Sequence, residues 1–298
     1  MTILSTSIDL SRLPAPDVVE TLSFETILKE MRDDLVARYP SISGVIDLES
    51  EPARKLLEVA AYREVGIRAR VNDAARSVLL PFATGGDLDQ IAAGYGVLRL
   101  VVSAGINGEA DVLESNERLR RRVQLAHEAR SVAGPSGAYV FHALSAVPTL
   151  RDAFAASPEG GHVRVVLMAD GEDPVPTDED VNSVRDALSP ETVRPLTDVV
   201  TVAKVQPVDV EIVASLTLYP GPDASLVIDD AISQVEKHVE RIRYIGFDLL
   251  RTAIFGRLHV DGVHSVQLSS PAADVVVDGD HCVRVTSIVI TAATGRDE

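Results

Sequence analysis

The chain has 298 residues, 46% of them hydrophobic and 24% charged, which is typical of a globular protein with about two domains. Its formal net charge of −17 at pH 7 argues against nucleic acid and anionic membranes as partners. Aromatic residues make up 4% and Trp is absent, which argues against stacking platforms for carbohydrate or single-stranded nucleic acid.

The cysteine content and the N-terminal sequence indicate where the chain folds. Cys282 is the single cysteine, so no internal disulfide can form, as expected in a reducing compartment. We expect no signal peptide, because no basic segment followed by an apolar one opens the sequence. No long apolar run predicts a membrane span. We therefore expect a soluble product that folds in the cytoplasm and does not contact a membrane.

Helical patterns dominate the first half of the chain. Residues 1–22 have no strong periodicity and are predicted to form an extended arm. An amphipathic helix is predicted from Phe24 to Tyr39, with Ser23 as its N-cap. A very long helix is predicted from about Glu51 to Leu80, with Ser50 as its cap.

The predicted long helix carries an apolar stripe, because its apolar residues recur at spacings of three, four or seven. A helix of this length must lie along a partner, in its own chain or in another, so we interpret it as an assembly element. Gly66 in its middle costs roughly 1 kcal/mol relative to alanine, which predicts a packing reason for it. The residues of the stripe are Leu56, Ala60, Ile67, Val71, Ala74 and Val78.

The hydrophobic period changes from helical to alternating near Val147. Beyond it, a buried strand is predicted at Val163–Met168 and a cleanly alternating one at Val208–Tyr219. The order strand, turn, helix, strand occurs twice, and Thr177 to Asp180 resembles a capping box. We therefore predict an α+β, multi-domain chain, with a helical N-terminal half containing one very long helix, followed by two small α/β units. The predicted domains are residues 1–147, 148–206 and 207–298.

The main concentration of positive charge lies on a helix predicted from Ser115 to about Arg130. Arg118, Arg121 and Arg122 share one side of it. We interpret them as a polar contact for an acidic partner surface, including another copy of this chain, or as a solvated face with local ion pairs. A nucleic-acid-binding tail component is a third interpretation, which the net charge disfavours.

Two histidines and an aspartate near the C-terminus have side chains of the kind that bind zinc. His259, Asp261 and His264 surround a short turn, and Cys282 follows His281. No CxxC or HExxH pattern frames them, so we interpret them as ordinary turn and strand residues. A metal-dependent hydrolase is kept as the alternative function. We predict no catalytic residue, no cofactor and no metal.

Several segments in order resemble the baseplate J-like family of contractile phage tails and phage-tail-like bacteriocins. The similarity runs from Ile8–Asp17 to the last predicted strand near Ile290, and the order of the segments is more specific than any one of them. The segments are LESEPARKLLEVAAYRE, RVNDAARSVLLPFATGGDLDQIAA, RRRVQLAHEARSVAGPSGAYVFHALS, LYPGP and LHVDGVHSVQLSSPAADVVV.

This resemblance implies a structural wedge protein of the tail baseplate in the virion, synthesised and assembled in the host cytoplasm. It implies contacts with a second wedge protein (gpI-type), with a sheath-initiator-type wedge protein (gpW-type) and with other copies of the chain in a six-fold ring around the central spike and tube. Tail fibres and the spike hub would be indirect partners. The ring would couple target engagement to sheath contraction. In this interpretation Leu56, Ala60, Ile67 and Val71 make helix-bundle contacts, and the C-terminal units contact neighbouring wedges.

Overall fold

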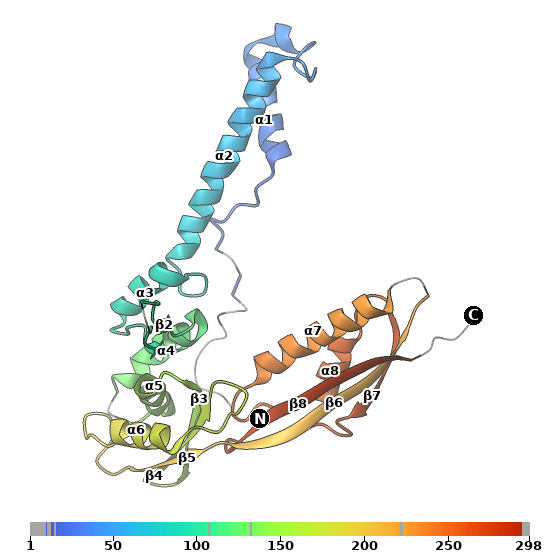
Figure 1. Ribbon diagram of the computed structural model, residues 1–298. Helices are drawn as coiled ribbons and strands as arrows, with labels where there is room; N and C mark the ends of the chain where they lie inside the picture. The colour runs from blue at the N-terminus through green and yellow to red at the C-terminus, as the bar shows by residue number, and fades with distance from the viewer. Residues whose placement is uncertain are drawn as a thin grey trace. The chain divides into compact units, whose positions relative to one another are not determined.

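The computed structural model describes residues 10, 13–14, 16–106, 108–131, 133–220 and 223–293 (Figure 1). In these residues it contains eight α-helices, one short 3-10 helix and three small β-sheets, which confirms the predicted mixture of helices and strands. The chain divides into two compact units, Ile8–Leu98 and a unit containing Arg99–Glu298. None of the helices in the described residues is long and apolar enough to cross a membrane.

The unit Ile8–Leu98 is helical. Helices α1 (Phe24–Arg38) and α2 (Pro52–Ser77) lie side by side, joined through the 3-10 helix η2 (Pro40–Ile42), and α3 (Gly85–Gly94) follows. The predicted cap of α1 is confirmed, because Ser23 Oγ accepts a hydrogen bond from the Thr26 backbone amide at 3.3 Å. The predicted arm at residues 1–22 lies partly outside the described residues.

Both ends of α2 differ from the sequence prediction, and prolines explain both. Glu51 rather than Ser50 is the N-cap. The residue before a proline avoids the helical region of φ and ψ, and Glu51 precedes Pro52. Its φ of −75° and ψ of 121° are accordingly extended. The helix ends at Ser77 rather than at Leu80. Pro81 lacks the amide hydrogen that would bond to the Ser77 carbonyl, and its ring would collide with that carbonyl.

The first sheet of the larger unit is a hairpin of β1 (Val101–Ser103) and β2 (Val112–Leu113). Helices α4 (Asn116–Ala129) and α5 (Ser136–Ala146) follow it.

The second sheet has the order β3-β4-β5, with β3 and β4 antiparallel and β4 and β5 parallel. Its elements are β3 (Leu150–Glu159), β4 (His162–Ala169), α6 (Asp178–Leu188) and β5 (Val199–Lys204).

Helices α5 and α6 share a core with one face of this sheet. The core joins Val165 and Leu167 of β4 to Tyr139 of α5 and Val184 of α6, all at most 1% exposed. Helix α6 begins with the predicted capping box, in which Thr177 and Asp180 bond reciprocally. Strand β3 was absent from the prediction, which placed the first strand of this region at Val163–Met168.

The third sheet has the order β7-β6-β8, with β6 antiparallel to β7 and parallel to β8. Helices α7 and α8 cover one face, where Ile212 and Leu216 of β6 meet Val235 and Leu258 of these helices (Figure 1). Its elements are β6 (Gln206–Leu218), α7 (Ala224–Ile242), α8 (Arg251–Leu258), β7 (Val263–Ser270) and β8 (His281–Ala293). The predicted domain limits at residues 147 and 206 stay a prediction.

Candidate assembly surfaces

The apolar residues predicted to share one side of the long helix form an exposed surface, which we call the α2 stripe. It consists of Leu56, Ala60, Ile67, Val71 and Ala74 of α2 and of Val78, the C-cap that follows it. Leu56 is 72% exposed, Ile67 66% and Val71 55%. Fully burying a side chain of this kind stabilises a complex by about 1.5–3 kcal/mol. Within the unit that contains it, the stripe is therefore an uncovered apolar surface suited to bind another helix.

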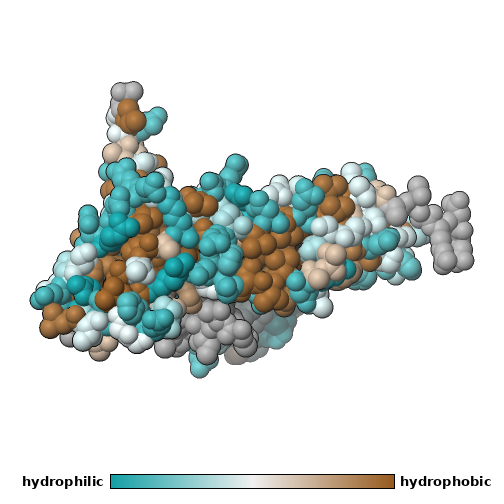
Figure 2. Space-filling model, turned by 90° about the horizontal axis from the view of Figure 1, so that it is seen from below, coloured by the Kyte–Doolittle hydropathy of each residue, from teal (hydrophilic) through white to brown (hydrophobic). Residues whose placement is uncertain are grey.

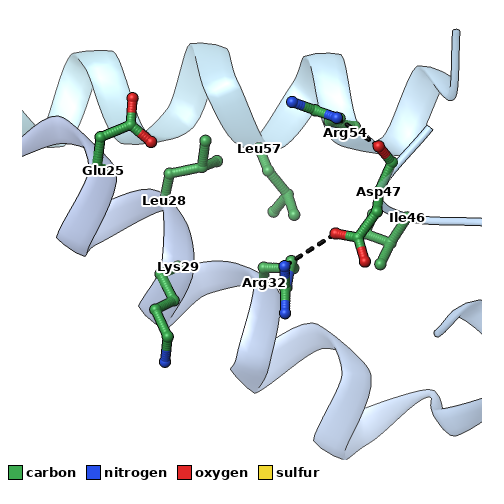
Figure 3. A pocket seen from close by; sticks show the side chains of 8 residues that line it. All are labelled: Glu25, Leu28, Lys29, Arg32, Ile46, Asp47, Arg54 and Leu57. Atoms are coloured by element: carbon green, nitrogen blue, oxygen red, sulfur yellow. Dashed lines mark hydrogen bonds and ion pairs between the residues drawn. The ribbon is translucent and has the colours of Figure 1, made fainter. Parts of the chain in front are cut away.

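A different side of α2 holds the helix in its own unit. Ala61 is fully buried, and Asn72, 7% exposed, exchanges two hydrogen bonds of 3.0 and 2.9 Å with the Glu20 backbone. Near the α1–α2 turn, Arg32 pairs with the Asp47 carboxylate at 2.9 Å, and Arg54 donates to the Asp47 carbonyl (Figure 3). These contacts fix α2 against α1 and the arm without using the stripe.

Arg118 and Arg122 of α4 bond inside the chain. Both pair with the buried carboxylate of Glu114, which also accepts the Leu100 amide at 3.0 Å. Burial lowers the pKa of both guanidinium groups, and Glu114 opposes this effect. The expectation of a solvated face is wrong for Arg122, which is 4% exposed, because it lies on the side of α4 that also holds the buried Leu119 and Ala126.

Arg118 also completes the C-terminal end of α5. Its guanidinium donates to the backbone carbonyls of Leu144, Val147 and Leu150, the last two at 2.9 Å. Carbonyls at a helix C-terminus lack partners within the helix and carry partial negative charge, so a cation stabilises them. Arg118 therefore holds α4, α5 and β3 together.

Arg121 connects the second sheet to the segment that follows α7. It pairs with Asp152 of β3 at 2.5 Å and lies over the Tyr244 ring at 5.5 Å. Asp152 is fully buried and accepts the Ile245 amide at 3.0 Å. The local ion pairs expected for the three arginines are thus present, and their role as a contact for a partner stays a prediction.

The residues considered for a metal site do not form one in the described part of the chain, where no cluster of three or more His, Cys, Asp or Glu could hold an ion. His264 packs edge-on against Tyr219, with ring centroids 5.1 Å apart. Burial raises the pKa of Cys282 to about 11, which disfavours the thiolate that would bind a metal.

Sequence reasoning missed a second group of exposed apolar residues, on the hairpin of β1 and β2. Ile106 is 71% exposed, Val112 57% and Leu113 50%. The apolar composition of this short segment was the available signal, but it equally indicates a buried strand. Apolar patches also alternate with polar residues on the face of the molecule seen in Figure 2.

An uncovered apolar stripe on a long helix is a feature of a protein that assembles with others. Family models agree with this class: the Baseplate J-like N-terminal domain matches residues 49–105, and the Baseplate J-like central domain matches residues 131–204. The chain is 39% identical over 300 residues to Baseplate protein J of Escherichia phage P2, covering 98% of this chain and 99% of that protein. The chain belongs to the baseplate J-like family.

Proposed function

We propose that the chain is a structural wedge component of the baseplate of a contractile phage tail or a tail-like particle, located in the virion and assembled in the host cytoplasm. Family membership supports the baseplate role. The observation that carries the wedge role is the α2 stripe, because a long helix with its apolar side exposed suits a bundle with helices of other chains.

The proposed partners are a second wedge protein, a sheath-initiator-type wedge protein and other copies of this chain in a six-fold ring. The region 1–147 would supply the bundle, and the α/β units at 148–206 and 207–298 would contact neighbouring wedges. The role is mechanical rather than catalytic: signals from the fibres shift packed interfaces between two arrangements, and the ring then releases the sheath.

Disrupting the stripe tests this proposal. Ile67→Asp places a charge in the middle of the α2 stripe and should block complex formation while leaving the chain folded, because Ile67 is 66% exposed. The chain is co-expressed with the products of its neighbouring genes, and complexes are weighed by mass photometry. The expected parent complex contains two copies of this chain and one of a second protein.

Leu196→Asp is the matched control, because Leu196 is also an exposed apolar residue, at 76%, but lies outside α2. It should still form the parent's wedge complex, because the region 148–206 that contains Leu196 is proposed to act in contacts between wedges and not within one. Normal assembly by the Ile67 variant would contradict the wedge role. One tightly bound zinc per purified chain would instead favour the hydrolase alternative.

A further inference from the structure

Two arginines lie beside the α2 stripe without an acidic partner. Arg63 and Arg70 are both exposed, and no ion pair forms to either of them within the described residues. Other basic residues of α2 behave differently: Arg54 pairs with Glu58 at 3.1 Å, and Arg68 pairs with Glu64 at 2.5 Å. The two uncompensated cations therefore mark one edge of the stripe.

The sequence of α2 explains why Arg63 stays uncompensated. Helix neighbours lie three and four positions away, and for Arg63 these are Val59, Ala60, Gly66 and Ile67, none of them acidic. Arg70 has one acidic neighbour of this kind, Asp73. In a chain with a net charge of −17, this edge is locally positive.

The spacing of the two arginines is that of a flanking position in paired helices. They are seven positions apart, so both lie on the same side of the helix, as the residues beside a coiled-coil seam do. Such flanking positions form ion pairs across the interface and determine which helix is accepted as partner. The partner's flanking position should therefore be acidic at the same seven-residue interval.

A second copy of α2 does not meet this requirement. In a parallel pair, a residue at this edge faces the residue five positions further along the other helix, which brings Arg63 to Arg68. In an antiparallel pair, residues of the same edge meet, which brings Arg63 to Arg70. Arg68 is already paired with Glu64, and in the parallel pair Arg70 meets Ala75, so neither orientation places a free carboxylate opposite Arg63 or Arg70.

We propose that the α2 stripe binds an amphipathic helix of a different protein, one that carries carboxylates at a seven-residue interval opposite Arg63 and Arg70. This inference rests on the proposed bundle function and specifies the chemistry of its partner. The small residues of the stripe, Ala60 and Ala74, allow that helix to approach closely.

Two synthetic helical peptides, each as long as α2, test the proposal. Both have leucine at the seam positions; one has glutamate and the other lysine at the flanking positions. Fluorescence anisotropy with the full chain should show binding of the glutamate peptide at least about tenfold tighter than that of the lysine peptide at low salt, a difference of about 1.4 kcal/mol. Added salt should reduce this preference.

The double variant R63E/R70E should reverse the preference, whereas R63K/R70K should keep it. R76E is the charge control, because Arg76 is exposed on α2 outside the stripe. Equal binding of both peptides, an unchanged preference in R63E/R70E, or a duplex DNA probe binding through these arginines would overturn the proposal. If any of these results is obtained while Ile67→Asp still blocks formation of the wedge complex, the proposed bundle function stands. Only the inference that the partner helix is acidic is then wrong.

Discussion

Glu114 is the residue on which the packing of α4 most depends. Its carboxylate is buried between Arg118 and Arg122, whose side chains are 11% and 5% exposed. Breaking a buried pair by removing one partner costs about 3–5 kcal/mol, because the remaining charge stays buried without compensation. Glu114→Ala should lower the free energy of unfolding by about this amount, measured by urea denaturation. Glu191→Ala, at an exposed site, should change it little.

The sequence predicted that these arginines share one side of a helix, but not that this side is buried. Helical spacing gives the angle between side chains and contains no information on what covers them. The covering groups are the α5 carbonyls and Asp152, which only the tertiary fold brings to α4. Buried charges of this kind are therefore mistaken for surface charges when only the sequence is read.

Two histidines, the buried His238 and the partly buried His142, make the stability of the chain depend on pH. Burial is the main cause that lowers the pKa of His142 and of His238 below the ordinary value of 6.5, and neither Nε2 has a partner in the described residues. The unfolded chain therefore binds more protons than the folded chain once the pH falls below about 6.5. The free energy of unfolding should decrease as the pH falls from about 7 toward 5.

Replacing a histidine separates this effect from general acid denaturation. His238→Gln removes one titrating group and should make the free energy of unfolding less dependent on pH in this range, as measured by denaturant titrations at several pH values. An unchanged slope in His238→Gln would show that other groups cause the dependence.

At the level of the element, α2 combines a helix-weakening residue with an exposed binding surface. Among the described residues no atom lies within 4 Å of where a Cβ on Gly66 would be, so no contact in that part of the chain requires glycine there. Gly66→Ala should stabilise the isolated chain by about 1 kcal/mol, seen as a higher melting temperature. If Gly66 serves close approach of a partner helix, the same variant should form the wedge complex less well in mass photometry.

Ala69→Gly is the converse control, because Ala69 lies on α2 outside the stripe. It should lower stability by a similar amount without a specific loss of assembly. Tighter assembly of Gly66→Ala would contradict a role for the glycine in partner approach.

Elements were predictable from the sequence where the local signal is strong. The caps at Ser23 and Thr177 and the position of strand β6 follow from side-chain hydrogen bonding and from clean alternation. Strand β3 was missed, because its sequence LRDAFAASPE is rich in alanine and does not alternate. Its tertiary neighbours, α5 on one face and the start of the third sheet on the other, stabilise it as a strand.

At the level of the whole molecule, the second and third sheets belong to one compact unit. A small buried cluster joins them, in which Val166 and Met168 of β4 meet Ile245 and Cys282. Arg164 also pairs with Asp280 at 2.8 Å. These contacts join residues far apart in the sequence, so a pattern read along the chain could predict strands and helices but not the junction between the two sheets.

Asp152 is the central polar group of that junction, so its removal should weaken the coupling of the two sheets. Asp152→Ala leaves the buried Ile245 amide without an acceptor, a loss of about 1–3 kcal/mol. We expect the two sheets to unfold together only while the junction is intact. Calorimetry should then show one unfolding transition for this unit in the parent chain and a broadened or split transition in Asp152→Ala. Asp280→Ala removes an exposed pair at the same junction and should have a smaller effect, since exposed ion pairs contribute little. A single sharp transition in Asp152→Ala, shifted only in temperature, would mean that the apolar cluster alone couples the sheets.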